Sequence, residues 1–334
     1  MHLLLHSKKQ LRCFADATNI FLLCLCLPFS AGYAVISPNE NESNRIFRIV
    51  SYNVENLFHP DCDSLNSDTD FTPDGKYHWT YYKYRRKVQN IAQIITNIGQ
   101  FDGIDIVGLC EVENQQCVND LCSVLHRFEY QYIHFDSPDK RGIDVALLYR
   151  PTFHLLNAYP ISVPLADGNT TRDILYASGI YHSTDTLHLF LCHLPSQLGG
   201  SAATAWKREA AMSVLQRHVD SIFATSPKAQ IVIMGDMNTK PENNIRGLHN
   251  AMLRLPKCSD SPLGTHKYHG YWSFLDQFYL SDSLLYTTEI QVYSAPYLLE
   301  DDLRYLDVKP RRTYIGYRYQ TGYSDHLPIV LTIQ

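Results

Sequence analysis

The stretch Gln230-Ile-Val-Ile-Met-Gly-Asp-Met-Asn238 runs from four apolar residues, three of them β-branched, into a glycine and two polar side chains. An apolar run of this kind predicts a strand that is buried on both faces. Asp236 and Asn238 follow the run and are two residues apart, so both side chains can point the same way. The stretch therefore predicts a buried strand that ends with a carboxylate and a carboxamide at the edge of a sheet.

Other strand-like runs along the chain end in the same way. Their polar neighbours are Asn53 after residues 47–52, Glu111 after 105–110, His193 after 189–192, and the pair Asp325 and His326 before 328–333. Each of these residues, taken alone, is best explained as a turn residue or a strand cap. Their repetition favours one shared site, because polar side chains at the ends of buried strands gather at one edge of a sheet.

Three amphipathic helices are expected between the strands, because apolar residues recur at spacings of three and four. The three stripes are Tyr84, Val88, Ile91, Ile95 and Ile98; Val118, Leu121, Cys122 and Leu125; and Met212, Leu215, Val219 and Ile222. Further strands are expected at 143–149 and near 174–182, 274–280 and 286–293. Strands in both halves of the chain, with helices between them, predict an α/β fold in which two packed sheets carry helices outside.

The N-terminus is typical of an export signal. Basic residues precede an apolar run at 20–29, and small residues follow it, as a signal peptidase requires. The run is too short to span a bilayer comfortably. We expect a signal peptide at 1–34, a polar leader at 35–45 and one domain at 46–334, in a protein exported to the periplasm, the cell surface or the medium.

Charge and cysteine usage exclude two kinds of protein. The formal net charge is −5, and loss of the basic leader makes it more negative, which argues against a grip on nucleic acid through a broad basic surface. The dense basic cluster at 83–87 is assigned to the polar face of the first helix. The nine cysteines include no CxxC pair, so a zinc site built on paired cysteines is not expected. Disulfides are compatible with export but cannot be assigned.

Four short motifs resemble, in order, the signatures of the endonuclease/exonuclease/phosphatase superfamily. They are Ser51-Tyr-Asn-Val-Glu-Asn-Leu-Phe58, Leu109-Cys-Glu-Val-Glu-Asn114, Gly235-Asp-Met-Asn238 and Ser324-Asp-His-Leu-Pro328. Each motif alone is weak evidence, but four in the right order across residues 46–333 are specific. The superfamily includes pancreatic-type DNases, abasic-site endonucleases, inositol polyphosphate phosphatases and bacterial sphingomyelinases. The resemblance implies a secreted bacterial-type member with the DNase I-like fold, a four-layer sandwich of two packed mixed β-sheets with helices on the outer faces.

The resemblance also implies a divalent cation, Mg²⁺ or Mn²⁺. Glu111 is the expected principal ligand, Asn53 is expected to support the metal or the phosphate, and Asp325 is a second candidate ligand. Oxygen ligands of this kind suit a hard cation that keeps waters for a substrate phosphate. The apolar run directly before Glu111 makes a solvated surface glutamate a poor alternative.

The catalytic roles follow from the same resemblance. The family places Asp236 and Asn238 beside the attacking water, Asp236 as its orienter or base and Asn238 as a donor to a phosphoryl oxygen. His326 is expected to donate to the phosphate in its charged form or to transfer a proton. Asp276 lies in an aromatic, apolar run where an unpaired carboxylate is costly, so it matches the partner that the family gives this histidine. His193 resembles the second imidazole of the DNase-like members.

Contacts to the substrate phosphate are less well specified. Arg172, in Thr-Arg-Asp before an expected strand, lies where relatives have a phosphate-facing arginine. Many relatives have a basic residue shortly after the second histidine, where Gln197 stands in this chain. Asp144 opens a strand and is either an orienter of His193 or a solvated acid. A solvated surface charge is the expectation for Arg141, Lys267, Arg311 and Arg312.

These features predict a metal-dependent, nuclease-like phosphodiesterase that hydrolyses a phosphoester by in-line attack of water. One alternative keeps the fold but acts as a phosphatase or phospholipase on a lipid or sugar phosphate, and the negative charge leans towards a small substrate. A non-catalytic binding module is less favoured, because Glu111, Asp236, Asn238 and His326 are all present. We expect a monomer without an obligate protein partner, whose substrate is nucleic acid, a small phosphodiester or a lipid phosphate.

Overall fold

The computed structural model describes residues 46–334 except 62–68, 140, 183–184 and 256–263, and all of these lie in one compact unit, Asn39–Gln334. The expected signal peptide and polar leader lie outside the described residues. Among the described helices, none has both the length and the apolar character needed to cross a membrane.

The first sheet, in the described part of the chain, has six strands in the order β13-β18-β1-β2-β4-β3. Their bounds are β13 Thr288–Val292, β18 Ile329–Ile333, β1 Phe47–Leu57, β2 Ile106–Val112, β4 Asp144–Tyr149 and β3 Gln131–His134. β1 and β2 run parallel, and the other neighbours run antiparallel. The sheet is therefore mixed, with one parallel pair at its centre.

The second sheet repeats this plan, with the described strands in the order β5-β6-β7-β8-β12-β9. Their bounds are β5 His154–Ile161, β6 Ile174–Tyr181, β7 Asp185–His193, β8 Gln230–Asp236, β12 Asp276–Ser281 and β9 Leu248–Asn250. β7 and β8 form its parallel pair. Carboxyl ends of parallel strands meet at one edge of a sheet, so each sheet brings two adjacent strand ends together.

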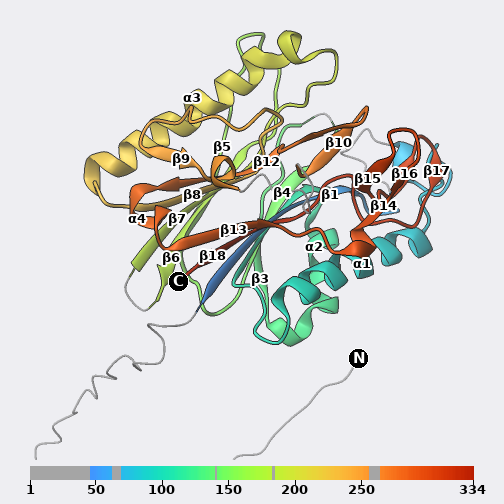
Figure 1. The fold of residues 1–334 in the computed structure, drawn as a ribbon, viewed down its shortest axis with the longest axis horizontal. Coiled ribbons are helices and arrows are strands. Elements are labelled where there is room, and N and C mark those ends of the chain that lie inside the picture. The colour runs from blue at the N-terminus through green and yellow to red at the C-terminus, as the bar shows by residue number, and fades with distance from the viewer. Residues whose placement is uncertain (1–45, 62–68, 140, 183–184, 256–263) are drawn as a thin grey trace, which may run out of the picture. The chain divides into compact units, whose positions relative to one another are not determined.

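Helices cover the outer faces, with α1 and α2 beside the first sheet and α3 beside the second (Figure 1). Their bounds are α1 Tyr81–Gly99, α2 Gln115–Val124, α3 Ser201–Thr225 and the short α4 Asp282–Leu285, with 3₁₀ turns at Thr69–Phe71, His126–Phe128, Ala251–Arg254 and Pro296–Leu298. Asn114 caps α2 by accepting a hydrogen bond from the amide of Cys117 at 3.0 Å. Three helices were expected from their apolar stripes, and α1, α2 and α3 confirm them.

Hydrophobic clusters separate the layers. In β1, Ile49 lies in the cluster between the two sheets, whereas Val50 lies in the cluster under α1 and α2. In β8, Val232 faces the space between the sheets, whereas Ile233 faces α3. This alternation is the period of two that an extended strand imposes. The layers are thus helix, sheet, sheet and helix, and the expected four-layer α/β sandwich is confirmed.

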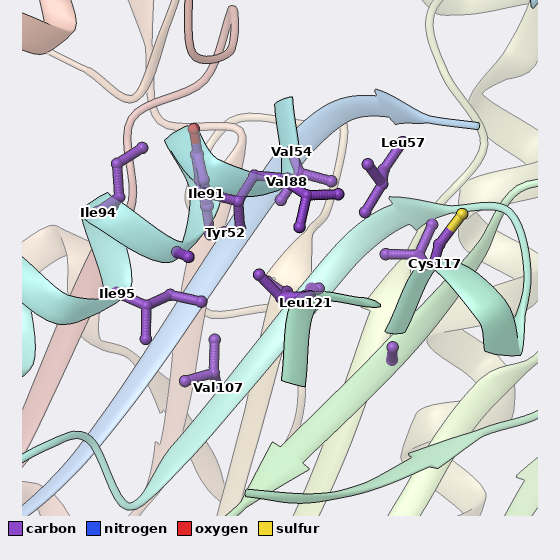
Figure 2. Close-up of a cluster of buried hydrophobic side chains, with 14 of the residues drawn as sticks. Tyr52, Val54, Leu57, Val88, Ile91, Ile94, Ile95, Val107, Cys117 and Leu121 are labelled. Carbon is purple, nitrogen blue, oxygen red and sulfur yellow. The ribbon is translucent and has the colours of Figure 1, made fainter. Parts of the chain in front are cut away.

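α1 packs on the first sheet through the apolar stripe that its sequence predicts. Figure 2 shows Val88, Ile91 and Ile95 lying over β1 and β2. Lys87 lies on the same buried stripe and is only 1% exposed, so its expected place on the polar face is wrong. Tyr84 precedes it by three residues and Ile91 follows it by four, which is the spacing of one helix face.

Edge strands and hairpins complete the described part, and no pattern in the sequence predicted them. They are the edge strands β3, β5 and β9 and the pairs β10 His266–Tyr268 with β11 Tyr271–Ser273, β14 Leu299–Asp302 with β15 Asp307–Pro310, and β16 Tyr314–Ile315 with β17 Arg318–Tyr319. Edge and hairpin strands contribute few buried residues, so their apolar signal is weak. Cys110, Cys117, Cys122 and Cys192 are free thiols, whereas Cys62 and Cys258 lie outside the described residues.

Candidate active site

The strand ends of both sheets meet at one site. Asn53 pairs with Cys110 of β2 near the end of the regular β1–β2 register, and His193 ends β7, next to Asp236 at the end of β8. The side-chain amide of Asn53 donates to Asp236 Oδ2 at 3.1 Å and to Glu111 Oε1 at 3.4 Å. Asn53 therefore connects the carboxylate from the first sheet with the carboxylate from the second, as the shared-site hypothesis required.

A histidine–aspartate pair lies beside these carboxylates. His326 Nδ1 lies 2.7 Å from Asp276 Oδ2, and its Nε2 lies 3.8 Å from Asp236 Oδ2. Burial alone lowers the pKa of His326, but Asp276 in contact, with Asp236 and Asp325 nearby, raises it well above its ordinary range. His326 is thus an imidazolium that can donate from Nε2 towards the centre of the site.

The second imidazole is in the opposite state. His193 Nε2 lies 3.7 Å from both Glu111 Oε1 and Asp236 Oδ2. Burial lowers the pKa of His193 well below its ordinary value, and the charges of two arginines and His326 lower it further. Its Nδ1 is buried and has no hydrogen-bond partner among the described residues. Asp144 does not orient it, because Asp144 is hydrogen-bonded to Ser137 instead.

Asp236 is the last residue of β8, and Asn238 lies on the tight turn that follows. The amide of Asn238 donates to Asp236 Oδ1 at 2.9 Å, and its side chain donates to Leu194 O at 3.0 Å. Gly235 makes the turn possible, since its φ is +132° and a Cβ there would lie 1.8 Å from Cys192 O. Burial raises the pKa of Asp236 to about 6, although the charge of His326 opposes this shift.

Glu111 and Asp325, the expected metal ligands, are each oriented by a donor. Glu111 has a φ of +68°, and its Oε2 accepts from the amide of Asn56 at 2.9 Å. Asp325 Oδ2 accepts from Arg312 at 2.8 Å. Burial alone raises the pKa of Asp325, but the charges of His326 and Arg312 bring it below the ordinary value.

The donor set fits a divalent cation. Five buried or half-buried acids lie in and around the site, namely Glu55, Glu111, Asp236, Asp276 and Asp325. Three cations, Lys87, Arg312 and His326, contact all of these acids except Glu111. A buried excess of carboxylate oxygens is costly without a further positive charge. Hard cations such as Mg²⁺ and Mn²⁺ take such oxygens as ligands.

The Arg172 side chain contacts backbone oxygens of the site. Its guanidinium donates to His193 O at 3.0 Å, to Leu194 O at 3.3 Å and to Asp139 Oδ2 at 3.0 Å. These bonds hold the end of β7 in place and use Nε, Nη1 and Nη2. Contact between Arg172 and a substrate phosphate stays a prediction.

Two arginines that were expected to be solvated lie at the site. Arg141 donates to the side-chain oxygen of Asn56 at 2.8 Å, next to the amide that binds Glu111. Arg312 lies between Asp325 at 2.8 Å and Glu55 at 3.4 Å. Their sequence context gave no sign of these contacts, which join segments far apart in the chain. Lys267 instead pairs with Asp302 and Asp307, which belong to β14 and β15.

A buried network behind Arg312 positions the segment that carries Asp325. Glu55 accepts from the amide of Thr313 at 2.6 Å. Lys87 Nζ lies 4.0 Å from Glu55 and donates to Thr313 Oγ1 and to Tyr323 O. α1 therefore holds residues 313–323 against the end of β1. The signal was present in the sequence, because Lys87 interrupts an apolar stripe.

A cavity of about 240 Å³ opens beside Glu55, Asn56 and Arg312. Its other walls are mainly aromatic, from Phe71, Tyr77, Trp79 and Tyr314. The polar tips of two of these rings are occupied, because Trp79 Nε1 donates to Phe58 O at 2.8 Å and Tyr314 donates to Tyr77 O at 2.9 Å. The cavity therefore lies between largely buried aromatic rings on one side and polar groups of the site on the other.

Comparison with known proteins agrees with this fold. Solved structures with the same fold include TDP2 from Caenorhabditis elegans (17% identity, TM-score 0.56, 86% of this chain and 75% of that one), the human Nocturnin catalytic domain (17%, 0.56, 86% and 94%) and a Bacteroides thetaiotaomicron mannosyl-6-phosphatase (16%, 0.55, 86% and 100%). At these identities the likeness establishes the fold. No curated protein matches the sequence. A sequence model of the Endonuclease/Exonuclease/phosphatase family matches residues 48–334, and the chain therefore belongs to that family.

Proposed function

We propose that the protein is a divalent-metal-dependent phosphoesterase that acts by in-line attack of water on a phosphodiester. Membership of the family supports phosphoester hydrolysis. The observation that carries the finer proposal is the Asn53 bridge at 3.1 and 3.4 Å between Asp236 and Glu111, with the imidazolium of His326 3.8 Å from Asp236. Glu111 as a cation ligand, Asp236 as the acceptor of a proton from water, and His326 as a charged donor thus lie close together in one centre.

Glu111 and Asp325 are the residues that would hold Mg²⁺ or Mn²⁺, and Asn53 would support the ion by donating to Glu111. When bound, such an ion stabilises negative charge on the phosphoryl group and on the leaving oxygen. A hydrogen bond orients each of these carboxylates, from the amide of Asn56 to Glu111 and from Arg312 to Asp325.

The remaining residues act on the water and the phosphate. Asp236 orients the attacking water and accepts its proton as the new P–O bond forms and the bond to the leaving group breaks. A pKa of about 6 suits a carboxylate that has to accept a proton near neutral pH. Asn238 and His326 donate to phosphoryl oxygens, where negative charge develops. His193 is neutral and lies between Glu111 and Asp236, within reach of a phosphoryl oxygen or the water.

The aromatic cavity supports a substrate with a compact organic group. It adjoins Asn56 and Arg312, which contact the expected ligands Glu111 and Asp325, so a group attached to the phosphate reaches it directly. The net charge of −5 disfavours broad binding of polynucleotides. A phosphatase acting on a sugar or lipid phosphate is the second candidate, favoured by the same cavity. We further propose that the protein is exported and monomeric.

Hydrolysis of bis(p-nitrophenyl) phosphate by the purified protein, with Mg²⁺, Mn²⁺ or EDTA, tests the reaction. We expect metal-dependent turnover that falls at least about 10²-fold in Glu111→Gln and in His326→Ala. His249→Gln is the matched control, because His249 is an exposed histidine that pairs with Asp282 on α4. Full metal-dependent turnover in either site variant would sink the proposal, and turnover only on monoesters would favour the phosphatase.

A further inference from the structure

A second group of ligand-type side chains lies outside the catalytic centre, where β3 connects to β4. His134 ends β3, Asp136 follows two residues later, and Asp144 opens β4. The antiparallel register pairs His134 with Ala146, which brings the end of β3 beside the start of β4. One ligand atom from each of the three residues lies within 4.8 Å of those of the other two.

The His134 side chain is buried without satisfying its ring. It is 3% exposed, and its Nε2 is a buried atom with no hydrogen-bond partner among the described residues. Nε2 faces Asp144 Oδ2 across 3.9 Å, which is too far for a hydrogen bond. A first-row cation bonds to imidazole nitrogen and carboxylate oxygen at about 2.0–2.2 Å, so an ion between the two atoms would draw them closer together by a few tenths of an ångström.

Asp144 is oriented as metal-binding carboxylates are. Its Oδ1 accepts from the amide of Ser137 at 3.2 Å and from the Ser137 hydroxyl. Oδ2 is thereby left facing His134. Such outer hydrogen bonds fix the direction of a ligand and strengthen binding. Asp136 Oδ1 lies 3.8 Å from His134 Nδ1, the other ring nitrogen, and the Asp136 side chain is 90% exposed. One of its oxygens lies within 4.8 Å of a ligand atom of both other residues.

The electrostatics of the group favour a cation. Among the described residues, no lysine or arginine forms an ion pair with Asp136 or Asp144. Burial raises the pKa of Asp144 to about 7, although its bonds to Ser137 oppose this, and the nearby charges of Asp136 and Asp139 add to the rise. A positive ion between these groups would relieve that cost.

We propose that His134, Asp136 and Asp144 form a binding site for a divalent first-row transition ion, with Zn²⁺ as the preferred ion. One imidazole nitrogen and two carboxylates, completed by water, make a mixed nitrogen and oxygen donor set that suits such ions. Mg²⁺ is disfavoured, because it takes oxygen ligands in an octahedral arrangement. The site is therefore distinct in chemistry from the oxygen-rich catalytic centre.

The position of this site links it to the active-site rim. The connection from β3 to β4 also carries Asp139, which pairs with Arg172 at 3.0 Å, and Arg141, which donates to Asn56 at 2.8 Å. An ion at the base of this connection fixes both ends of the segment that holds these two contacts. The ion has a structural role here, and the reaction proposed above does not depend on it.

Binding of Co²⁺ to the metal-stripped protein tests the site, because Co²⁺ takes zinc-type sites and its visible absorption reports their geometry. Equilibrium dialysis counts the bound ions. We expect His134→Gln and Asp144→Asn each to lose one equivalent relative to the unchanged protein, with the matching part of the Co²⁺ spectrum. Asp136→Asn is expected to weaken this equivalent by at least about tenfold. Excess Zn²⁺ should displace it, and excess Mg²⁺ should not.

Two controls separate this site from the catalytic centre. Glu111→Gln should retain the equivalent that His134→Gln loses, whether or not the catalytic proposal holds. His249→Gln removes an exposed histidine that lies 2.6 Å from Asp282, and it should lose nothing. The proposal is overturned if folded His134→Gln and Asp144→Asn bind as many Co²⁺ ions as the unchanged protein, or if Glu111→Gln abolishes all binding.

Discussion

Two histidine–aspartate pairs in this molecule differ mainly in one distance. In the catalytic centre, His326 lies 2.7 Å from Asp276, whereas at the start of β4 His134 lies 3.9 Å from Asp144. Both histidines are buried, and burial lowers the pKa of each. Carboxylates, Asp276 foremost, overcome burial at His326 and raise its pKa, whereas the pKa of His134 falls below its ordinary value.

Two other histidines of the site also lie near carboxylates without a hydrogen bond to them, and the pKa of each is lowered. His266 lies 4.0 Å from Asp325, and burial together with the charge of His326 lowers its pKa to about 4. His193 lies 3.7 Å from two carboxylates and is also neutral. A hydrogen bond to the charged form compensates for lost water, and a carboxylate about 1 Å further away does not. Contact with Asp276 is therefore the largest of the carboxylate effects that raise the pKa of His326, and Asp236 and Asp325 add to it.

Removing the contact between His326 and Asp276 should have the largest effect on catalysis. In Asp276→Asn, His326 loses its closest carboxylate, so burial lowers its pKa and the donor to the phosphate is neutral at lower pH. We expect kcat to fall by about 10²- to 10⁴-fold. The alkaline limb of the pH–rate profile should also move to lower pH. Both are measured with bis(p-nitrophenyl) phosphate and Mg²⁺.

The pH profile separates this role from a merely structural one. A variant that only loosened the fold would lower kcat without moving the limb. Asp144→Asn removes a buried aspartate of similar burial from the other pair, and it should leave kcat within about tenfold and the limb in place. An unchanged limb in Asp276→Asn would show that the charge of His326 has another source.

Lys87 is a buried amine that, like His134, lies about 4 Å from a carboxylate without a hydrogen bond to it. Its Nζ lies 4.0 Å from Glu55, and burial lowers its pKa to about 8 although Glu55 opposes the shift. An unfolded lysine has a pKa of about 10.4, so the folded state binds fewer protons than the unfolded state between pH 8 and pH 10. The folded protein therefore gains stability relative to a variant without this amine as the pH rises through that range.

Lys87→Met measures that effect. We expect it to be destabilised by about 3 kcal/mol at pH 7, because Glu55 loses a buried partner. The difference from the unchanged protein should widen by about 1–3 kcal/mol between pH 8 and pH 10. Urea denaturation at both pH values gives the two free energies of unfolding, and Lys228→Met, at an exposed lysine, controls for general lysine titration. A constant difference would mean that Lys87 keeps its ordinary pKa.

Local sequence was sufficient to predict the residues at the strand ends. Asn53, Glu111, His193 and Asp236 follow apolar runs, and two parallel strand pairs bring them together. That prediction works because one strand determines both burial and the position of the next polar residue. The predicted sandwich follows from the same runs.

Local sequence was insufficient for contacts between distant segments. Arg312 was expected to be solvated, yet it lies between Glu55 and Asp325, and Glu55 is 257 residues earlier in the chain. The residues next to Arg312 in the sequence give no sign of the acids that neutralise its charge. The burial of Lys87 was partly predictable from the sequence, because Lys87 falls on the apolar stripe of α1. The failure at these positions has one physical cause, since a charge network depends on which loops meet.

The smallest expected effect is a change in the pKa of His134, which lies 3.9 Å from Asp144. In protein treated with EDTA, NMR titration should show His134 losing its proton below the ordinary pKa of histidine, because burial outweighs the charge of Asp136. His134→Gln identifies the resonance. Asp136→Asn should lower the pKa further, since Asp136 is the charge that raises it, and Asp276→Asn should leave it unchanged. A His134 pKa above the ordinary value would mean that 3.9 Å is close enough to stabilise an imidazolium, and the distinction between contact and gap would fail.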